Sequence, residues 1–106
     1  MMLGIIGGSG LDKMEIFTSL REVQITTPFG APSDAFTLGT IGLTPCALLA
    51  RHHRSHTLSP TAINYRANIY AFKKLGCTHI IATTACGSLQ EAYQPQQLAL
   101  PDSFID

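Results

Sequence analysis

Charged side chains are scarce in this sequence. They make up 13% of its 106 residues, whereas about 25% is typical of soluble domains. The 7 basic and 7 acidic residues cancel, so the formal net charge is +0. A neutral chain has no overall field that would attract a nucleic-acid backbone or an anionic membrane surface. We therefore expect neither nucleic acid nor membrane as a partner.

Cysteine is rare, and long apolar runs are missing. Cys46, Cys77 and Cys86 are odd in number and show no Cys-x-x-Cys spacing, which disfavours a disulfide framework and a zinc ribbon. We expect buried free thiols in a reducing compartment. The sequence has no basic leader and no apolar run near the ~20 residues that span a bilayer. These absences predict a cytoplasmic protein.

The length of the chain suits one small domain, which we assign to residues 1–106. Hydrophobic residues make up 45% of the sequence, which is enough to form a core. The sequence stops at Asp106, directly after an apolar stretch, and we expect a chain that is cut within a longer domain.

The first half of the chain is expected to be rich in strands. Residues 3–6 suit a short buried strand, and alternation of polar and apolar residues predicts a half-buried strand at 21–26. Residues 35–41 and 43–50 are expected to form two more strands, with a turn at Gly42. These strands are expected to have antiparallel neighbours. Residues 14–20 are ambiguous and are interpreted as a single helical turn.

The clearest helix signal follows a histidine-rich stretch. Ser59 can serve as N-cap, Pro60 suits the first helical position, and Gly76 ends the helix. The face expected to be apolar consists of Ala62, Tyr65, Ile69 and Phe72. Strands before this helix and at residues 79–85 after it imply a crossover between parallel strands. With one more strand at residues 98–100, the fold class is α/β with a mixed sheet.

Small, hydroxylic or basic residues follow three of the expected strands. They are GGSG at residues 7–10, RHHRSH at 51–56 and TTACGS at 83–88. Open α/β sheets hold ligands at the carboxyl ends of their strands. A glycine turn can aim N–H groups at an anion, and arginine matches phosphate oxygens with a planar fork of donors. We predict that these three strand ends meet and bind one anion, phosphate.

Each segment also has a plainer interpretation. The glycine segment lacks both the dinucleotide and the nucleoside-triphosphate spacing, so an ordinary turn remains open. The basic segment suits a solvated loop, or a metal site through His52 and His56, although it contains no Asp or Glu. Cys86 has no assignable activating partner, so an inert buried thiol is favoured over a nucleophile. Structural or interface roles are expected for Asn64, Tyr65, Arg66 and Asn68.

Five segments occur in the order and spacing of a known family. They are IIGGSGL at residues 5–11, TPFGAPSD at 27–34, ARH at 50–52, NYRANI at 64–69 and TTACGS at 83–88. Together they resemble the 5′-methylthioadenosine phosphorylases, in the purine nucleoside phosphorylase superfamily. The resemblance covers essentially the whole chain. It implies the N-terminal portion of that fold, a mixed β-sheet with flanking helices that is incomplete at residue 106.

The resemblance implies a pentosyltransferase activity. Phosphate would split 5′-methylthioadenosine into adenine and 5-methylthioribose 1-phosphate, a reaction of purine and methionine salvage. The implied partners are the nucleoside and phosphate, which is a co-substrate, and no cofactor or metal is implied. The full-length protein is expected to be a homotrimer, and the isolated 106-residue chain is expected to be inactive.

The resemblance also assigns roles to individual residues. The phosphate-binding residues that it implies are Ser9, Arg51, His52, Thr84 and Ala85. The purine-pocket residues that it implies are Cys86 and Gly87. The acidic residue that contacts the purine in the family lies beyond Asp106, so the catalytic residue is unknown in this chain.

Two positions depart from the family pattern. His53 stands where relatives often have glycine, and Ser9 replaces a common threonine but keeps the hydroxyl. The Ala-Cys-Gly-Ser run at residues 85–88 favours adenine-type members. The alternatives that remain open are a phosphorylase of methylthioinosine, inosine or guanosine, a nucleosidase, a histidine-based metal hydrolase, and an inactive truncated product or assembly module.

Overall fold

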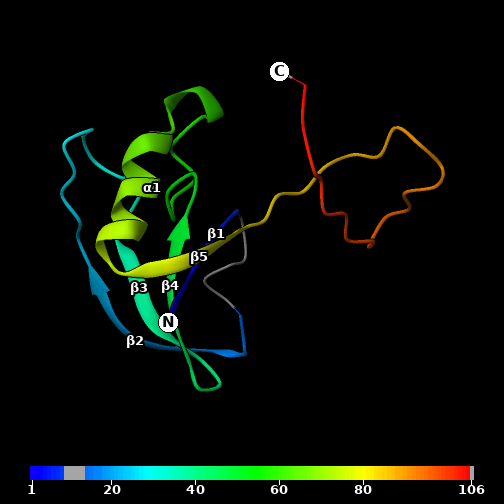
Figure 1. The fold of residues 1–106 in the computed structure, drawn as a ribbon. Helices are drawn as coiled ribbons and strands as arrows, with labels where there is room; N and C mark the ends of the chain where they lie inside the picture. Colours follow the sequence, from blue (N-terminus) through cyan, green and yellow to red (C-terminus); the bar gives the residue numbers. More distant parts are fainter. Residues whose placement is uncertain (9–13, 106) are drawn as a thin grey trace.

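The computed structural model describes residues 1–8 and 14–105. Its strands form one sheet in the order β2-β3-β4-β1-β5. Helix α1 covers one face of this sheet (Figure 1). In chain order the elements are β1 Met2–Gly7, β2 Phe17–Val23, β3 Phe36–Ile41, β4 Thr44–Ala50, the 3₁₀ turn η2 Pro60–Ala62, α1 Tyr65–Lys74 and β5 Cys77–Ala82.

The sheet is mixed. Strands β2, β3 and β4 are antiparallel neighbours, whereas β1 lies between β4 and β5 and is parallel to both. The chain therefore leaves β4, forms α1 and crosses over β1 to reach β5. The antiparallel pairing expected in the first half is confirmed for β2, β3 and β4. It is wrong for β1, which has only parallel neighbours among the described strands. The parallel crossover is confirmed.

The second strand begins and ends earlier than the alternation predicts. It spans Phe17–Val23 rather than residues 21–26. The helical turn expected at residues 14–20 is wrong, because a turn closed by a Phe17 N–H···Met14 O hydrogen bond of 3.3 Å leads directly into the strand. Val23 pairs with Phe36, the first residue of β3, so residues after Val23 have no partner in the ladder.

The core lies between α1 and the facing side of the sheet. Phe72 of α1 meets Phe36 of β3 edge to face, with ring centroids 4.9 Å apart. Gly4 of β1 makes room for this pair, because a Cβ there would lie 2.6 Å from the Phe72 ring. The buried cluster consists of Ile6, Phe36, Leu38, Ala47, Leu49, Ala71 and Phe72.

The helix begins later than its sequence signals predict. The Ser59 hydroxyl accepts a hydrogen bond from Ala62 N–H and so caps η2 instead of α1. The backbone is extended at Ile63, with φ −67° and ψ 129°. Asn64 is the N-cap of α1, and its side chain accepts from Ala67 N–H at 3.1 Å. A strong capping residue after the 3₁₀ turn therefore restarts the helix.

The buried face of α1 also differs from the expected one, apart from Phe72, which is buried as expected. The buried residues of the helix are Ala67, Asn68, Ala71 and Phe72. Tyr65 and Ile69, which were expected on the apolar face, are each 54% exposed. The end of the helix is as predicted, since Gly76 adopts a φ of +93° that favours glycine.

Polar side chains fix α1 to the loop between β2 and β3. The buried Asn68 amide accepts from Ser33 N–H at 2.8 Å and donates to Ser33 Oγ at 3.0 Å. Asn64 Nδ2 donates to Phe29 O at 2.7 Å. The structural roles expected for Asn64 and Asn68 are therefore confirmed.

Strand β5 forms one edge of the sheet and is shorter than expected at its end. It spans Cys77–Ala82 instead of residues 79–85. Its last paired residue, Ala82, lies opposite Ile6 near the end of β1. Thr83 N–H adds one more hydrogen bond, to Ile6 O at 2.9 Å. Among the described residues, the pairing of β5 with β1 ends here.

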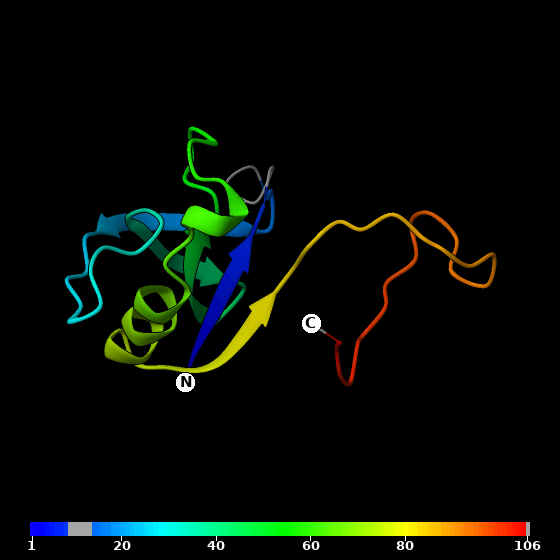
Figure 2. The same ribbon diagram turned by 90° about the horizontal axis from the view of Figure 1, so that it is seen from above.

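Residues 83–105, all of which the structure describes, contain no helix or strand. Figure 2 shows this segment, orange to red, extending away from the sheet and α1. The strand expected at residues 98–100 is therefore wrong. Leu98 and Leu100 follow an apolar pattern but are fully exposed, because no neighbouring strand among the described residues pairs with them. No helix within the described ranges has the length and apolar character needed to cross a bilayer.

Candidate anion site at three strand ends

The carboxyl ends of β1, β4 and β5 are joined by hydrogen bonds. Arg51 N–H, directly after β4, donates to Gly7 O at the end of β1 at 3.0 Å. Thr83, directly after β5, donates its N–H to Ile6 O of β1. The Arg51 guanidinium crosses over β1, and its Nη2 donates to Thr83 O at 2.7 Å. Two of the segments that the sequence singles out, 51–56 and 83–88, thus begin side by side.

Ser9 of the glycine segment lies outside the described residues. Gly7 and Gly8 lead toward it from the end of β1, and Gly8 is exposed. For the glycine segment, the structure therefore shows only that the strand leading into it, β1, lies between β4 and β5.

His52 is held by a closed loop. Leu58 N–H donates to His52 O at 3.1 Å, and the His52 ring Nδ1 lies 2.9 Å from Leu58 O. Because a carbonyl oxygen only accepts, Nδ1 must carry a proton. This contact fixes the ring and assigns its remaining nitrogen, Nε2, to any ligand of the site.

Two histidines of the loop adopt left-handed backbone conformations. His53 has φ 69° and His56 has φ 54°, a region that costs a non-glycine residue about 1–2 kcal/mol. This conformation explains why glycine suits the position of His53. Ser55 N–H donates to His53 Nδ1 at 3.1 Å and helps to hold the turn.

Arg54 is engaged by carboxylates. Its Nε and its main-chain N–H both lie 2.9 Å from Asp34 Oδ2, and its Nη1 lies 2.7 Å from Glu22 Oε1. These hydrogen bonds raise the pKa of Arg54. Burial works to raise the pKa of Asp34, but hydrogen bonds from Arg54 and from Ala35 N–H outweigh it, and the net pKa is lowered. Arg54 is therefore a structural residue, and the sequence interpretation missed both of its partners.

The remaining candidate residues follow β5 and are exposed. Thr84, Ala85, Cys86 and Gly87 lie in the irregular segment after Thr83. The prediction of buried thiols holds for Cys46 only, because Cys77 is half-buried and Cys86 is exposed, although all three are free. Burial, and to a lesser extent Cys46, raises the pKa of Cys77.

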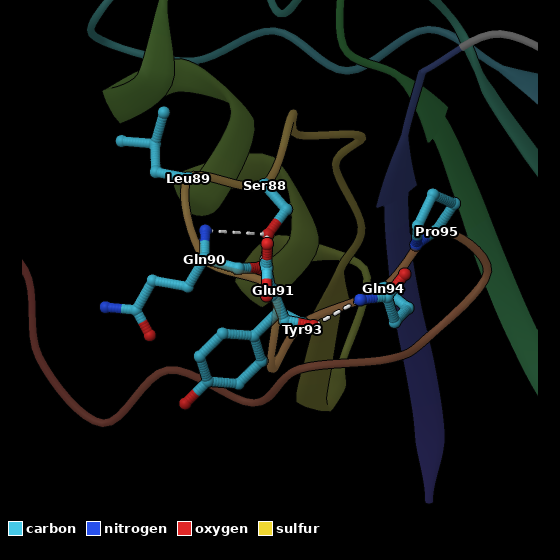
Figure 3. Close-up of a pocket in the computed structure, with 7 residues that line it drawn as sticks. All are labelled: Ser88, Leu89, Gln90, Glu91, Tyr93, Gln94 and Pro95. Carbon is cyan, nitrogen blue, oxygen red and sulfur yellow. Dashed lines mark hydrogen bonds between the residues drawn. The ribbon is translucent and has the colours of Figure 1, made fainter.

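A hollow of about 400 Å³ lies in the C-terminal segment and is separate from the strand ends (Figure 3). Hydrogen bonds within the segment shape it, such as the one from Gln90 N–H to Ser88 Oγ at 3.2 Å. Its lining residues are Ser88, Leu89, Gln90, Glu91, Tyr93, Gln94 and Pro95. It contains none of the predicted site residues, and it presents a single carboxylate with no cationic partner in its lining.

The described part of the chain contains no group of three His, Cys, Asp or Glu residues close enough to hold a metal ion. His52 and His56 in particular are not joined by a third ligand there. The Arg51 guanidinium keeps N–H donors beyond the one that binds Thr83 O, and a guanidinium suits an anion.

The model of a family described as the phosphorylase superfamily matches residues 2–106. The S-methyl-5′-thioadenosine phosphorylase of Thermosynechococcus vestitus is 58% identical over 98% of this chain and 36% of its own length. The enzyme of the same name from Danio rerio is 56% identical over 98% of this chain and 37% of its own length. The chain thus spans little more than a third of these relatives.

Solved structures give the same result for the fold. The apo form of methylthioadenosine phosphorylase from Schistosoma mansoni superimposes with a TM-score of 0.81 at 52% identity, over 89% of this chain and 33% of that one. The same protein in complex with tubercidin gives a TM-score of 0.78 at 54% identity, over 84% of this chain and 32% of that one. The predicted N-terminal portion of a purine nucleoside phosphorylase-like fold, with an incomplete sheet, is confirmed.

Proposed function

Because this chain belongs to the phosphorylase superfamily, we propose that the full-length protein catalyses phosphorolysis of 5′-methylthioadenosine, with this chain contributing most of the phosphate site. The products are adenine and 5-methylthioribose 1-phosphate. The protein acts as a pentosyltransferase in purine and methionine salvage. We further propose that it is a cytoplasmic homotrimer that needs no cofactor.

One observation supports this proposal above the others. The Arg51 guanidinium spans from the end of β4 to Thr83 O at the end of β5, with β1 between them. A donor-rich group is thereby held against Thr83, which directly precedes the predicted phosphate ligands Thr84 and Ala85. Arginine has five N–H donors, so the bond to Thr83 O leaves further donors for phosphate oxygens.

In the proposed mechanism, phosphate is the nucleophile. A phosphate oxygen forms a bond to the anomeric carbon of the ribose as the bond from that carbon to the purine nitrogen breaks. The bonding electrons leave with the purine, and the sugar passes through an oxocarbenium-like state. Arg51, His52, Thr84 and Ala85, together with Ser9, hold the anion below the cationic sugar, which lowers the barrier through proximity and charge.

The same arrangement suggests a place for the base. Cys86 and Gly87 follow the proposed phosphate ligands directly and carry little side-chain bulk. A flat, small surface suits the face of a purine ring. The Ala-Cys-Gly-Ser run at residues 85–88 supports adenine as the base, in agreement with the names of the relatives.

Product analysis with and without phosphate tests this function. The full-length protein is incubated with 5′-methylthioadenosine, and adenine and the sugar product are quantified by chromatography and mass spectrometry. We expect adenine release only with phosphate, and a sugar product that carries phosphate. Equal release without phosphate would indicate a nucleosidase, and faster cleavage of inosine or guanosine would replace the proposed substrate.

A further inference from the structure

The loop at residues 51–58 is held at its start, at its end and in its middle. Its start is fixed by the Arg51 N–H···Gly7 O hydrogen bond, and its end by the paired contacts of His52 and Leu58. In its middle, Arg54 is bound by Glu22 of β2 and by Asp34, which lies in the connection between β2 and β3.

Asp34 presents both carboxylate oxygens to donors. Oδ2 accepts from the main-chain N–H and the Nε–H of Arg54, each at 2.9 Å. Oδ1 accepts from Ala35 N–H at 2.7 Å and lies 3.6 Å from His53 Nε2. Since Ser55 N–H donates to His53 Nδ1, the ring proton of a neutral His53 lies on Nε2, toward Asp34.

The carboxylate itself is well enclosed. The Asp34 side chain is only 7% exposed, whereas the side chains of Arg54 and Glu22 are 45% and 52% exposed. An amide at position 34 could not replace it, because its NH₂ group would face a donor on one side. The contact therefore requires a carboxylate and not merely a polar residue of the same size.

We propose that Asp34 is a positioning residue for phosphate, which sets the conformation of the 51–58 loop through Arg54 and His53 and so aligns Arg51 and His52 with the anion. This inference rests on the proposed phosphate site. It adds a residue from outside the three strand ends, and one that would not itself touch the substrate. His53 has a left-handed φ of 69°, which costs a non-glycine residue free energy, and the Asp34 contacts with His53 and Arg54 help to hold that conformation.

Steady-state kinetics of the full-length protein test the inference. Asp34→Asn is expected to raise KM for phosphate about tenfold or more, because loss of loop alignment weakens several hydrogen bonds to one anion. KM for 5′-methylthioadenosine is expected to stay within about twofold. Asp34→Glu, which keeps both acceptor oxygens, is expected to give an intermediate KM for phosphate.

Glu22→Gln is the matched control. It removes a carboxylate from the same Arg54 guanidinium but leaves every contact of Asp34 in place. Its KM for phosphate is expected to stay within about twofold of the wild type, since the pair is exposed and solvent-screened. An Asp34→Asn protein that melts earlier but keeps the wild-type KM for phosphate would reduce Asp34 to a purely structural role and overturn the proposal.

Amide hydrogen exchange separates this inference from the proposed function. In the 106-residue chain, the Arg54 N–H is expected to exchange at least about tenfold faster in Asp34→Asn than in the wild type and Glu22→Gln. Equal exchange rates in wild type and Asp34→Asn would refute the positioning role whatever the enzyme does. The full-length protein could also show no phosphate-dependent cleavage while the Arg54 N–H still exchanges faster in Asp34→Asn. That result would retain the contact between Asp34 and the loop and reject the proposed reaction.

Discussion

Arg51 and Arg54 lie three positions apart in one loop, yet their guanidinium groups have different partners. Arg54 is bound by Asp34 and Glu22, while Arg51 reaches across β1 to a main-chain oxygen. A guanidinium whose charge is balanced by two carboxylates attracts a further anion only weakly. A guanidinium bound to a neutral carbonyl keeps its full positive charge for an anion. At the residue scale, Arg51 is therefore the better phosphate ligand.

Arg51→Ala should raise KM for phosphate about 10- to 100-fold, because a hydrogen bond to a charged group contributes roughly 1.5–3 kcal/mol. KM for the nucleoside should change far less. The measurement is initial velocity of the full-length protein over a range of phosphate concentrations. Arg66→Ala, at an exposed position of α1, is the control. A wild-type phosphate requirement in Arg51→Ala would count against the assigned role.

The three thiols should differ sharply in reactivity toward a disulfide reagent. Cys86 is exposed, Cys77 is half-buried with a raised pKa, and Cys46 is buried. Because the thiolate is the reactive form, Cys86 should react first, Cys77 at least about tenfold more slowly, and Cys46 only on unfolding. The rate of thiol modification is followed over time, and peptide mapping identifies which cysteine reacts in each phase. A fast phase that persists in Cys86→Ser would contradict it.

At the scale of elements, α1 is attached to the molecule by two kinds of contact. Phe72 packs into the core against Phe36, and Asn68 bonds the main chain and hydroxyl of Ser33. Both Asn68 and Ser33 are buried, at 1% and 4% exposure. A buried amide with matched partners fixes the loop that carries Asp34 to the helix.

Asn68→Ala should lower the free energy of unfolding by about 1–3 kcal/mol, because it leaves Ser33 N–H buried without an acceptor. Urea denaturation of the 106-residue chain measures the change. Combining it with Ser33→Ala forms a double-mutant cycle. We expect a coupling energy above ~0.5 kcal/mol, and strictly additive effects would show that the pair is not energetically linked.

Gly4→Ala tests how closely β1 approaches α1. The added methyl would lie 2.6 Å from the Phe72 ring, so the core must shift at a cost of about 1–3 kcal/mol. Gly87→Ala, which meets nothing within 4 Å, is the control for stability. Adding Phe72→Leu to Gly4→Ala should cost less than Phe72→Leu alone. Equal stability of Gly4→Ala and wild type would contradict the close packing.

The sequence patterns predict most elements, and they place β1, β3 and β4 to within one residue at each end. They miss the start of α1 and the limits of β2 and β5. The limits of β2 and β5 depend on which partner residues are present, since Val23 and Ala82 are the last with a neighbour in the ladder. Residues 98–100 are an apolar run like that of a strand but have no partner among the described residues, and an apolar run alone cannot reveal this.

At the scale of the whole molecule, contacts between distant segments build the candidate site. The convergence of β1, β4 and β5 was predictable, because parallel strands end at the same edge of a sheet. The link from Arg54 to Asp34, 20 residues away, was not, because no local pattern pairs the two. The Ser9 prediction stays a prediction.

The stability of the whole chain should depend on Asp34 in acid. Its pKa is lowered in the fold, so its contribution is complete above the ordinary value of 3.8 and is lost as the pH falls through the lower folded value. At pH 7, Asp34→Asn should be less stable by about 1–3 kcal/mol. This gap should narrow in urea titrations as the pH falls below 3.8 and through the lowered folded pKa. A gap that is independent of pH would contradict the assignment.

The central claim is that the ends of β1, β4 and β5 hold one phosphate ion, and a crystal structure of the full-length protein grown with phosphate tests it most directly. We expect a single phosphate within hydrogen-bonding distance of Arg51 and His52 from one segment and of Thr84 and the Ala85 N–H from another. A phosphate bound elsewhere, or touched by only one of these segments, would contradict the account.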